Sequence, residues 1–285
     1  MVGLGNKGRF GRLDELLGLF AMSAVHFSVL VLLQLLWRGS AWKVIFARQC
    51  TAFGGLLLAC GLSSVEMPAN AATYNAAVAQ TYDILDGGGA AEVLGLNKLR
   101  RDAGAKVKGS VLEVAVGTGL QSSYYDVDAM TSYTAVDSSP SMLVEARSKW
   151  SNSPRLAALN PKLLEMDAAH LDLPSASFDS VIDTFSFCTF REPELVAREM
   201  IRVLKPGGVL VLLENSVSTN PALKLVQDIT EPIVTPLSKS CRWNVNVPSI
   251  IEKVGGVQLV AVDDEQLGTI TLRVYNKANE ATGRR

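Results

Sequence analysis

A strand-like run that breaks into a glycine turn, from Val111 to Leu120, limits the fold more than any other stretch of the chain. Aliphatic residues fill its first half, and Gly117-Thr118-Gly119 follows at once. A strand, a tight glycine turn and a helix start are what a nucleotide-like ligand needs at the carboxyl edge of a parallel sheet. The glycines let the backbone approach the ligand, because a Cβ would occupy that space. We therefore expect a parallel α/β sheet with a ligand loop here.

Acidic residues follow the next strand-like runs. Asp137 comes 20 residues after Gly117, the usual distance to the acid that holds a ribose in such folds. Asp167-Ala168 ends a third strand that we expect at Leu163 to Met166, and Asp183 lies within a fourth at Phe178 to Phe185. Because the carboxyl ends of parallel strands meet at one edge, the spacing predicts that these acids gather there.

The rest of the chain alternates between helical and strand patterns. Ser139 and Pro140 are start signals for a helix, which we expect to follow Asp137. Pro232 and Pro236 are expected to interrupt a partly helical stretch. The other expected elements are helices at 72–85, 90–103, 192–204 and 248–254, a helix of two turns after Gly119, a fifth strand at 209–214, and a hairpin of strands at 257–262 and 269–275.

The first 71 residues differ from the remainder and predict a targeting or membrane-anchor region. Leu16 to Trp37 carries no formal charge over 22 residues, which is long enough to cross a bilayer. Cys50 to Val65 has the length of a signal-peptide core, and Ala69 and Ala71 fit a small-x-small cleavage site. Acid-poor leaders with serine and arginine also suit organelle import, so we expect a membrane-associated protein of a mitochondrion or plastid, with residues 72–285 as the second domain.

Composition excludes several classes of site. The net charge of −1 gives no reason to expect a nucleic-acid partner. Two histidines rule out a multi-histidine metal site, and the four cysteines form no CxxC pair, so no metal is expected. The oligomeric state leaves no mark in the sequence.

Five segments in order resemble the class I S-adenosylmethionine-dependent methyltransferases, over residues 72–285. They are Leu112 to Gly119, Asp137, Asp167-Ala168, Phe178 to Asp183, and Val203 to Gly208. The family's usual first glycine is Ala115 here, which narrows the turn. The resemblance implies a Rossmann-like α/β fold with seven strands, five parallel plus a C-terminal antiparallel hairpin, flanked by helices.

Within this family, the chain resembles the quinone-biosynthesis type and the membrane-anchored mitochondrial methyltransferase-like group with its thiol-methylating relatives. The segments that carry this likeness are Asp183 to Phe190, Leu212 to Asn215, and Cys241 to Asn244. Bacterial phosphatidylethanolamine N-methyltransferases share the run that begins at Glu113 and remain an alternative. The implied substrate is a small, lipophilic acceptor: a quinone precursor, a thiol or a lipid.

The resemblance also implies how the cofactor S-adenosylmethionine is held. Glu113 and the loop residues Ala115, Gly117, Thr118 and Gly119 would hold the methionine end, and Asp137 would bind the ribose. Asp167 and the backbone N–H of Ala168 would read the adenine edge. Further residues expected at the cofactor are Ser138 and Met142 beside the adenine, and Asp183, for which a methionine contact competes with catalysis.

A general base is needed only where the acceptor atom carries a proton. The weak candidates are Asp183, Cys188 and His170, and none is singled out. Two other functions remain in competition. A catalytically silent, cofactor-binding assembly factor for a membrane complex would also retain the cofactor residues. A nicotinamide oxidoreductase would need GxGxxG, which the run from Gly117 to Ser122 lacks.

Overall fold

The structure is a computed structural model that describes residues 79, 82–83, 91–92, 95–238, 240–265 and 268–279. The expected targeting region at 1–71, and most of the helix expected at 72–85, lie outside these residues.

Among the residues described, no helix combines the length and the apolar character needed to cross a membrane.

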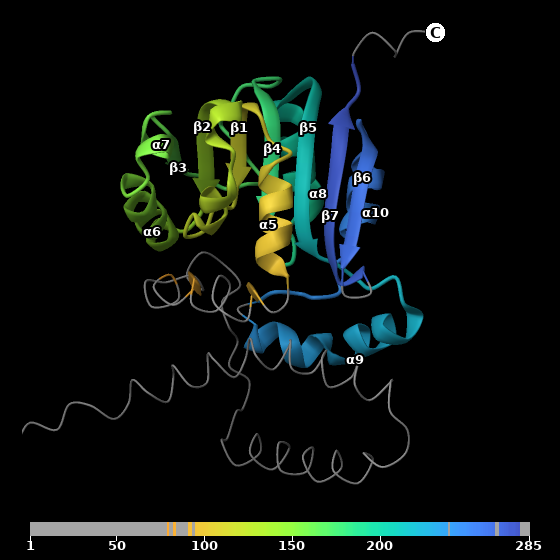
Figure 1. The fold of residues 1–285 in the computed structure, drawn as a ribbon. Coiled ribbons are helices and arrows are strands. Elements are labelled where there is room, and N and C mark those ends of the chain that lie inside the picture. The colour runs from red at the N-terminus through yellow and green to blue at the C-terminus, as the bar shows by residue number, and fades with distance from the viewer. Residues whose placement is uncertain are drawn as a thin grey trace, which may run out of the picture. The chain divides into compact units, whose positions relative to one another are not determined.

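A seven-stranded sheet in the order β3-β2-β1-β4-β5-β7-β6 forms the centre of the described chain (Figure 1). Its first five strands are parallel, and β7 runs antiparallel to both β5 and β6. This confirms the expected α/β sheet of five parallel strands and a C-terminal hairpin. The strands are β1 (Gly109–Val114), β2 (Met130–Asp137), β3 (Lys162–Glu165), β4 (Phe178–Thr184), β5 (Leu204–Asn215), β6 (Val257–Glu265) and β7 (Ile270–Lys277).

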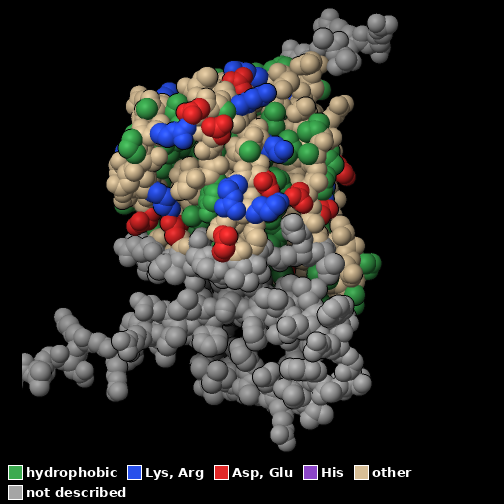
Figure 2. Space-filling model, viewed as in Figure 1, with side chains coloured by type: hydrophobic (Ala, Val, Ile, Leu, Met, Phe, Trp, Pro, Cys, Tyr) green, Lys and Arg blue, Asp and Glu red, His purple; other side chains and the backbone are tan. Residues whose placement is uncertain are grey.

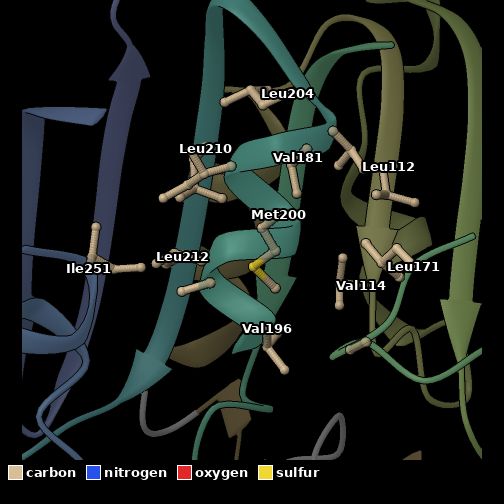
Figure 3. Packing of buried hydrophobic residues seen from close by; sticks show 14 of the residues in the cluster. Leu112, Val114, Leu171, Val181, Val196, Met200, Leu204, Leu210, Leu212 and Ile251 are labelled. Atoms are coloured by element: carbon tan, nitrogen blue, oxygen red, sulfur yellow. The ribbon is translucent and has the colours of Figure 1, made fainter. Parts of the chain in front are cut away.

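Helices cover both faces of this sheet because successive strand residues point to opposite sides. Leu112 of β1 and Leu212 of β5 pack with Met200 against α8 (Pro193–Val203) and α10 (Val247–Val254), as Figure 3 shows. Their neighbours Val111 and Val211 face the other side, against α5 (Leu96–Gly104) and α6 (Pro140–Ser151). Each such side chain, when fully buried, contributes about 1.5–3 kcal/mol through the hydrophobic effect.

The helix starts follow local sequence signals. Ser139 caps α6 by accepting a hydrogen bond from the backbone N–H of Met142, and Pro140 takes the first helical position, as expected. Asn246 caps α10 in the same way, from Ser249. Because α6 begins directly after Asp137, this cap fixes the chain at the carboxyl end of β2. A single turn, α7 (Pro154–Ala157), lies between α6 and β3.

Three expectations about local structure were wrong. The two-turn helix after Gly119 is a 3-10 helix, η2 (Leu120–Tyr124), followed by η3 (Val127–Ala129). The backbone of Tyr124, at the end of η2, packs closely on Gly104 of α5, where a Cβ would lie 2.2 Å from the carbonyl oxygen of Tyr124. The fifth strand, expected at 209–214, already begins at Leu204, because Leu204 pairs with Phe178 of β4.

The third correction concerns the helix α9 (Pro221–Leu237), which continues through Pro232 and Pro236. Tertiary contacts hold the helix before the prolines, and a side-chain hydrogen bond within the helix spans Pro232. Gln227 is buried and bonds to three backbone groups. Beyond Pro232, the hydroxyl of Thr235 donates to Glu231. Figure 1 shows α9 beyond the carboxyl ends of β4 and β5.

Basic and acidic side chains are interspersed over the face shown in Figure 2. Several form exposed ion pairs, including Lys98–Asp102 on α5 at 2.7 Å and Arg155–Asp128 at 2.5 Å. Exposed pairs of this kind add little to stability, so the buried layers on the two faces of the sheet hold the fold together.

Candidate functional site

A cavity of about 440 Å³ lies at the carboxyl edge of the parallel strands. The loops after β1, β2, β3 and β4 all contribute to its wall, as the strand-end argument predicts. The lining residues are Tyr82, Ala115, Gly117, Asp137, Ser138, Ser139, Met142, Met166, Asp167, Ala168, Ala169, Thr184, Phe185, Ser186, Thr189, Phe190, Arg191, Glu192, Val196 and Ser240.

The glycine turn after β1 uses its two glycines for different purposes. Gly117 lines the cavity at φ +55°, and a Cβ there would meet no heavy atom within 4 Å. Gly119, at φ +74°, faces α6, where a Cβ would lie 3.0 Å from Nε1 of Trp150. Ala115 also lies in the left-handed region, at φ +51°, and lines the cavity. The turn therefore leaves open space for a ligand at Gly117, whereas Gly119 permits close packing.

Asp137 ends β2 and joins the glycine turn to the start of α6. One carboxylate oxygen, Oδ2, accepts the backbone N–H of Gly117 at 2.8 Å, and Oδ1 accepts that of Ser139 at 2.8 Å. Burial raises the pKa of this carboxyl, while the two backbone donors oppose the rise. Each oxygen keeps lone-pair capacity for another donor, so Asp137 can accept from a ligand without losing its own partners.

The segment after β3 forms a neighbouring part of the wall. Met166 and Ala168 line the cavity with Asp167, whose Oδ1 accepts the backbone N–H of Ala169 at 2.9 Å. The side chain of Asp167 is 68% exposed, and its other oxygen lies 3.5 Å from Nδ1 of His170. Ser138 and Met142, from the start of α6, complete this half of the cavity.

Glu113 lies in β1 but is not among the lining residues. It is buried on the α5 side of the sheet, where its Oε2 accepts the hydroxyls of Tyr125, at 2.6 Å, and of Tyr133. Burial raises the pKa of this carboxyl to about 7, against the lowering effect of the two hydroxyls. Thr118 and Gly119 also lie outside the wall, and the hydroxyl of Thr118 donates to Asp83 at 2.5 Å.

The structure thus brings seven of the expected cofactor residues to one cavity and leaves four outside its wall. The seven are Ala115, Gly117, Asp137, Ser138, Met142, Asp167 and Ala168, and the four are Glu113, Thr118, Gly119 and Asp183. Two of the four are next to lining residues in the chain, since Asp183 precedes Thr184 and Thr118 follows Gly117.

None of the three candidate bases lines the cavity. His170 is an exposed residue whose side chain is 72% accessible, whereas Asp183 and Cys188 are buried. Further lining residues, outside the expected cofactor set, come from the loop after β4, notably Phe185, Ser186 and Arg191. Their place after a parallel strand was the available signal. Tyr82 belongs to the helix expected at 72–85, which precedes the first strand, and Ser240 comes from a distant segment without any such signal.

The loop after β4 is held by Arg242 from the segment after α9. The backbone N–H of Arg242 donates to the carbonyl oxygen of Cys188 at 3.0 Å, and its guanidinium donates to that of Phe190 at 2.5 Å. Phe185, at φ +59°, begins the loop in the left-handed region. These contacts give the second half of the cavity a defined shape, with Phe185, Phe190 and Val196 as its apolar side.

The sequence matches known methyltransferases over most of the residues that build the cavity. Residues 112–212 match the family model described as a methyltransferase domain. The chain is 39% identical over 109 residues to phosphatidylethanolamine N-methyltransferase of Cereibacter sphaeroides, covering 38% of this chain and 51% of that protein. It is 27% identical to the ubiquinone/menaquinone biosynthesis C-methyltransferase UbiE of Haemophilus ducreyi, covering 62% of each.

A third relative is the mitochondrial methyltransferase OMS1 of Saccharomyces cerevisiae, at 26% identity over 62% of this chain and 40% of that protein. The curated relatives are matched over 40 to 64% of their own length.

Among solved structures, a SAM-dependent methyltransferase from Thermotoga maritima shares the fold with a TM-score of 0.53. The two chains are 19% identical, over 72% of this chain and 99% of that one. The sheet order, the glycine turn at the carboxyl edge and the matched residues agree with one another: this chain carries a methyltransferase domain of the class I S-adenosylmethionine-dependent family.

Proposed function

We propose that this protein transfers a methyl group from S-adenosylmethionine to a small, lipophilic acceptor. The observation that carries the proposal is the pairing of Asp137 with open space at Gly117 on one cavity wall. The cofactor fits these residues, because its ribose offers two hydroxyls to a carboxylate. The chain that leads to its methionine end needs a stretch of wall without a Cβ atom, as at Gly117.

The residues of the wall suggest how each part of the cofactor would be held. Asp137 would accept from the ribose hydroxyls, and the open space at Gly117 would admit the chain that leads to the methionine end. Asp167, Ala168 and Met142 would surround the adenine. When bound, S-adenosylmethionine supplies a methyl group that is already activated on a sulfonium, so the protein's task is alignment and exclusion of water.

The apolar half of the cavity supports a lipophilic acceptor. Phe185, Phe190 and Val196 line it, and they come from the loop after β4 and from α8. The name of the relative UbiE, a ubiquinone/menaquinone biosynthesis C-methyltransferase, points the same way. A quinone precursor is therefore the acceptor that we propose first, with a thiol or a lipid as the alternatives. The relative OMS1 is described as mitochondrial, which supports a mitochondrial location for this chain.

A catalytically silent assembly factor is the second candidate. It is favoured by one observation, that the expected bases Asp183, Cys188 and His170 all lie off the cavity wall. Such a protein would bind the cofactor with the same residues and turn nothing over.

Incubation of the full chain with labelled S-adenosylmethionine and a membrane lipid extract separates the two. Label is expected in a quinone, thiol or lipid product, and its chemical identity names the acceptor. The Asp137→Ala variant should lose this incorporation, which shows that the label passes through the cavity. Cofactor binding by calorimetry together with no labelled product would favour the assembly factor.

A further inference from the structure

Two carboxyl groups lie buried side by side beneath the cavity. Asp183 is near the end of β4 and Glu214 near the end of β5, on adjacent parallel strands, and both side chains are 0% exposed. One oxygen of Asp183, Oδ2, is buried and has no hydrogen-bond donor among the described residues. Two buried acids in contact can share a single proton, because the neutral carboxyl of one donates to the other.

Ser186 joins this pair to the cavity. Its hydroxyl donates to Oδ1 of Asp183, and its backbone N–H donates to Oε1 of Glu214 at 3.3 Å. The next backbone N–H, of Phe187, donates to Oε2 of Glu214 at 3.1 Å. Ser186 is itself one of the lining residues and is 7% exposed. It therefore touches the pair on one side and the ligand space on the other.

The surroundings favour a proton on the pair at neutral pH. Burial raises the pKa of Asp183 to about 7, and burial together with Asp183 raises the pKa of Glu214 well above its usual range. The other titratable groups that face the pair are Glu113 from β1 and the thiol of Cys188, which is hydrogen-bonded to Cys241. Glu113 raises the pKa of Asp183 further. The pair can thus give up or take up a proton near neutrality.

We propose that Ser186 is a catalytic residue that receives a proton from the methyl acceptor and passes its own to the buried Asp183–Glu214 pair. This rests on the proposed function. In the step, the acceptor's X–H bond breaks toward Oγ of Ser186, and the hydrogen of that hydroxyl moves to Oδ1 of Asp183. The electron pair left on X forms the new bond to the methyl carbon, and the carbon–sulfur bond breaks, leaving a neutral thioether. Asp183 and Glu214 act through the serine and are positioning residues.

This arrangement also defines the class of acceptor. A pair that titrates near neutrality matches a weakly acidic X–H bond, as in a hydroquinone or a thiol. The serine is buried beside the apolar half of the cavity, so the X–H group would be carried on a lipophilic body. The test therefore uses one acceptor from each source: menadiol as the hydroquinone and octanethiol as the thiol.

The first experiment measures turnover of the full chain with these two probes. Ser186→Ala is expected to lower kcat about 100-fold, with the affinity for S-adenosylmethionine unchanged by calorimetry. Ser186→Thr, which keeps the hydroxyl, should restore much of the rate. Ser123→Ala, at an exposed serine off the cavity, is the matched control and should behave like the wild type. A wild-type kcat in Ser186→Ala with the acceptor that the wild type methylates would overturn the proposal.

The second readout is the pH profile, which a merely structural serine would not move. The wild-type kcat should rise with pH through neutrality as the pair loses its proton, and Asp183→Asn and Glu214→Gln should each flatten that rise. Variants that keep wild-type circular dichroism and cofactor affinity are the ones compared. An unaltered profile in both folded variants would contradict the role of the pair.

A third measurement separates this inference from the proposed function. Infrared spectra of the wild type at neutral pH should contain the absorption of a buried protonated carboxyl that Glu214→Gln removes. Its absence overturns the inference even if methyl transfer is found. If no acceptor is methylated while the absorption is present, the proposed methyl transfer fails and the shared proton stands.

Discussion

Asp137 holds the glycine turn and the start of α6 in place while facing the cavity. Its two oxygens accept the backbone N–H groups of Gly117 and Ser139, so the turn and the helix cannot move independently of this carboxylate. Backbone donors directed at both oxygens orient them, and a ligand with a pair of hydroxyls would find them already placed. The residue thus links the shape of the cavity to the affinity for the cofactor.

Replacing Asp137 by alanine is expected to weaken S-adenosylmethionine binding 10- to 100-fold, about 1.5–3 kcal/mol, because both ribose contacts are lost. Isothermal calorimetry measures this change, and thermal unfolding followed by circular dichroism shows that the domain remains folded. Asp172→Ala, at an exposed acid off the cavity wall, is the control and should bind normally. Unchanged affinity in Asp137→Ala would remove this residue from the site.

A substitution at Gly117 tests whether the open space beside this residue is needed for cofactor binding. Gly117→Ala places a methyl group in the open space of the cavity wall, so cofactor affinity should fall at least about tenfold. Gly95→Ala is the matched control, since Gly95 also has a positive φ and open space around it but lies off the cavity wall. Both variants place a side chain on a residue with a positive φ, which strains the backbone.

Equal cofactor affinities of the two alanine variants would show that strain, and not lost space, explains the effect at Gly117. Binding in Gly117→Ala at the wild-type level would contradict the assignment of the loop.

At the scale of elements, α9 shows how a buried amide can hold a helix against unfavourable local sequence. Gln227 donates from Nε2 to the carbonyl oxygens of Trp243, at 2.7 Å, and of Ser216, at 3.2 Å, and its Oε1 accepts the N–H of Ser218 at 2.7 Å. Three loop backbone groups therefore depend on one side chain of the helix. The prolines that follow remove backbone donors without releasing the helix from these loops.

Gln227→Leu should lower the free energy of unfolding by about 3 kcal/mol, because it leaves those three backbone groups buried without partners. Urea unfolding measures the loss. The same substitution at Gln258, an exposed glutamine of β6, should change stability very little and controls for the chemical change itself. A loss in Gln227→Leu no larger than in Gln258→Leu would show that the loops do not need the amide.

Elements with strong local signals were predictable from the sequence. The apolar run of β4, the capping serine Ser139 of α6 and the proline Pro248 in the first turn of α10 each carry their information within a few residues. The errors arose where contacts with residues distant in the sequence determine the local structure. The hydrogen bonds of Gln227 to its loop partners keep α9 helical despite Pro232 and Pro236. Pairing with Phe178 makes Leu204 the first residue of β5, ahead of the two glycines.

The candidate site was predictable to the same extent. Residues directly after strand ends, such as Asp137 and Asp167, were found because the carboxyl ends of parallel strands converge. The surroundings of Glu113 were not predictable, since its neighbours on the strand do not reveal that Tyr125 and Tyr133 enclose it. Ser240 and Tyr82 reach the cavity from other parts of the chain, and no spacing rule connects them to it.

At the scale of the whole molecule, the centre of the sheet contains three buried acids on adjacent strands: Glu113 on β1, Asp183 on β4 and Glu214 on β5. Burial is the largest cause of the raised pKa of each one. The folded protein therefore binds more protons near neutrality than the unfolded chain, in which these groups have ordinary pKa values. Stability must then depend on pH in a defined direction.

Stability is expected to fall as pH rises from 4.5, the ordinary value for Glu113, through its folded value of about 7. The contribution from Glu113 is fully present below this window and is lost above it, a change on the order of 3 kcal/mol. Urea unfolding at several pH values measures the slope, and Glu113→Gln should reduce it. A stability that rises with pH across this window would contradict the prediction.

The position of β7 determines when the sheet can be completed during synthesis of the chain. This strand lies between β5 and β6 in the sheet although it is the last of the seven along the chain. While the chain is being synthesised, the free edge of β5 stays open until residues 270–277 have left the ribosome, and β6 has no neighbour to pair with until then. A nascent chain stalled before Ile270 would present an apolar strand edge to other chains, which is a known route to aggregation.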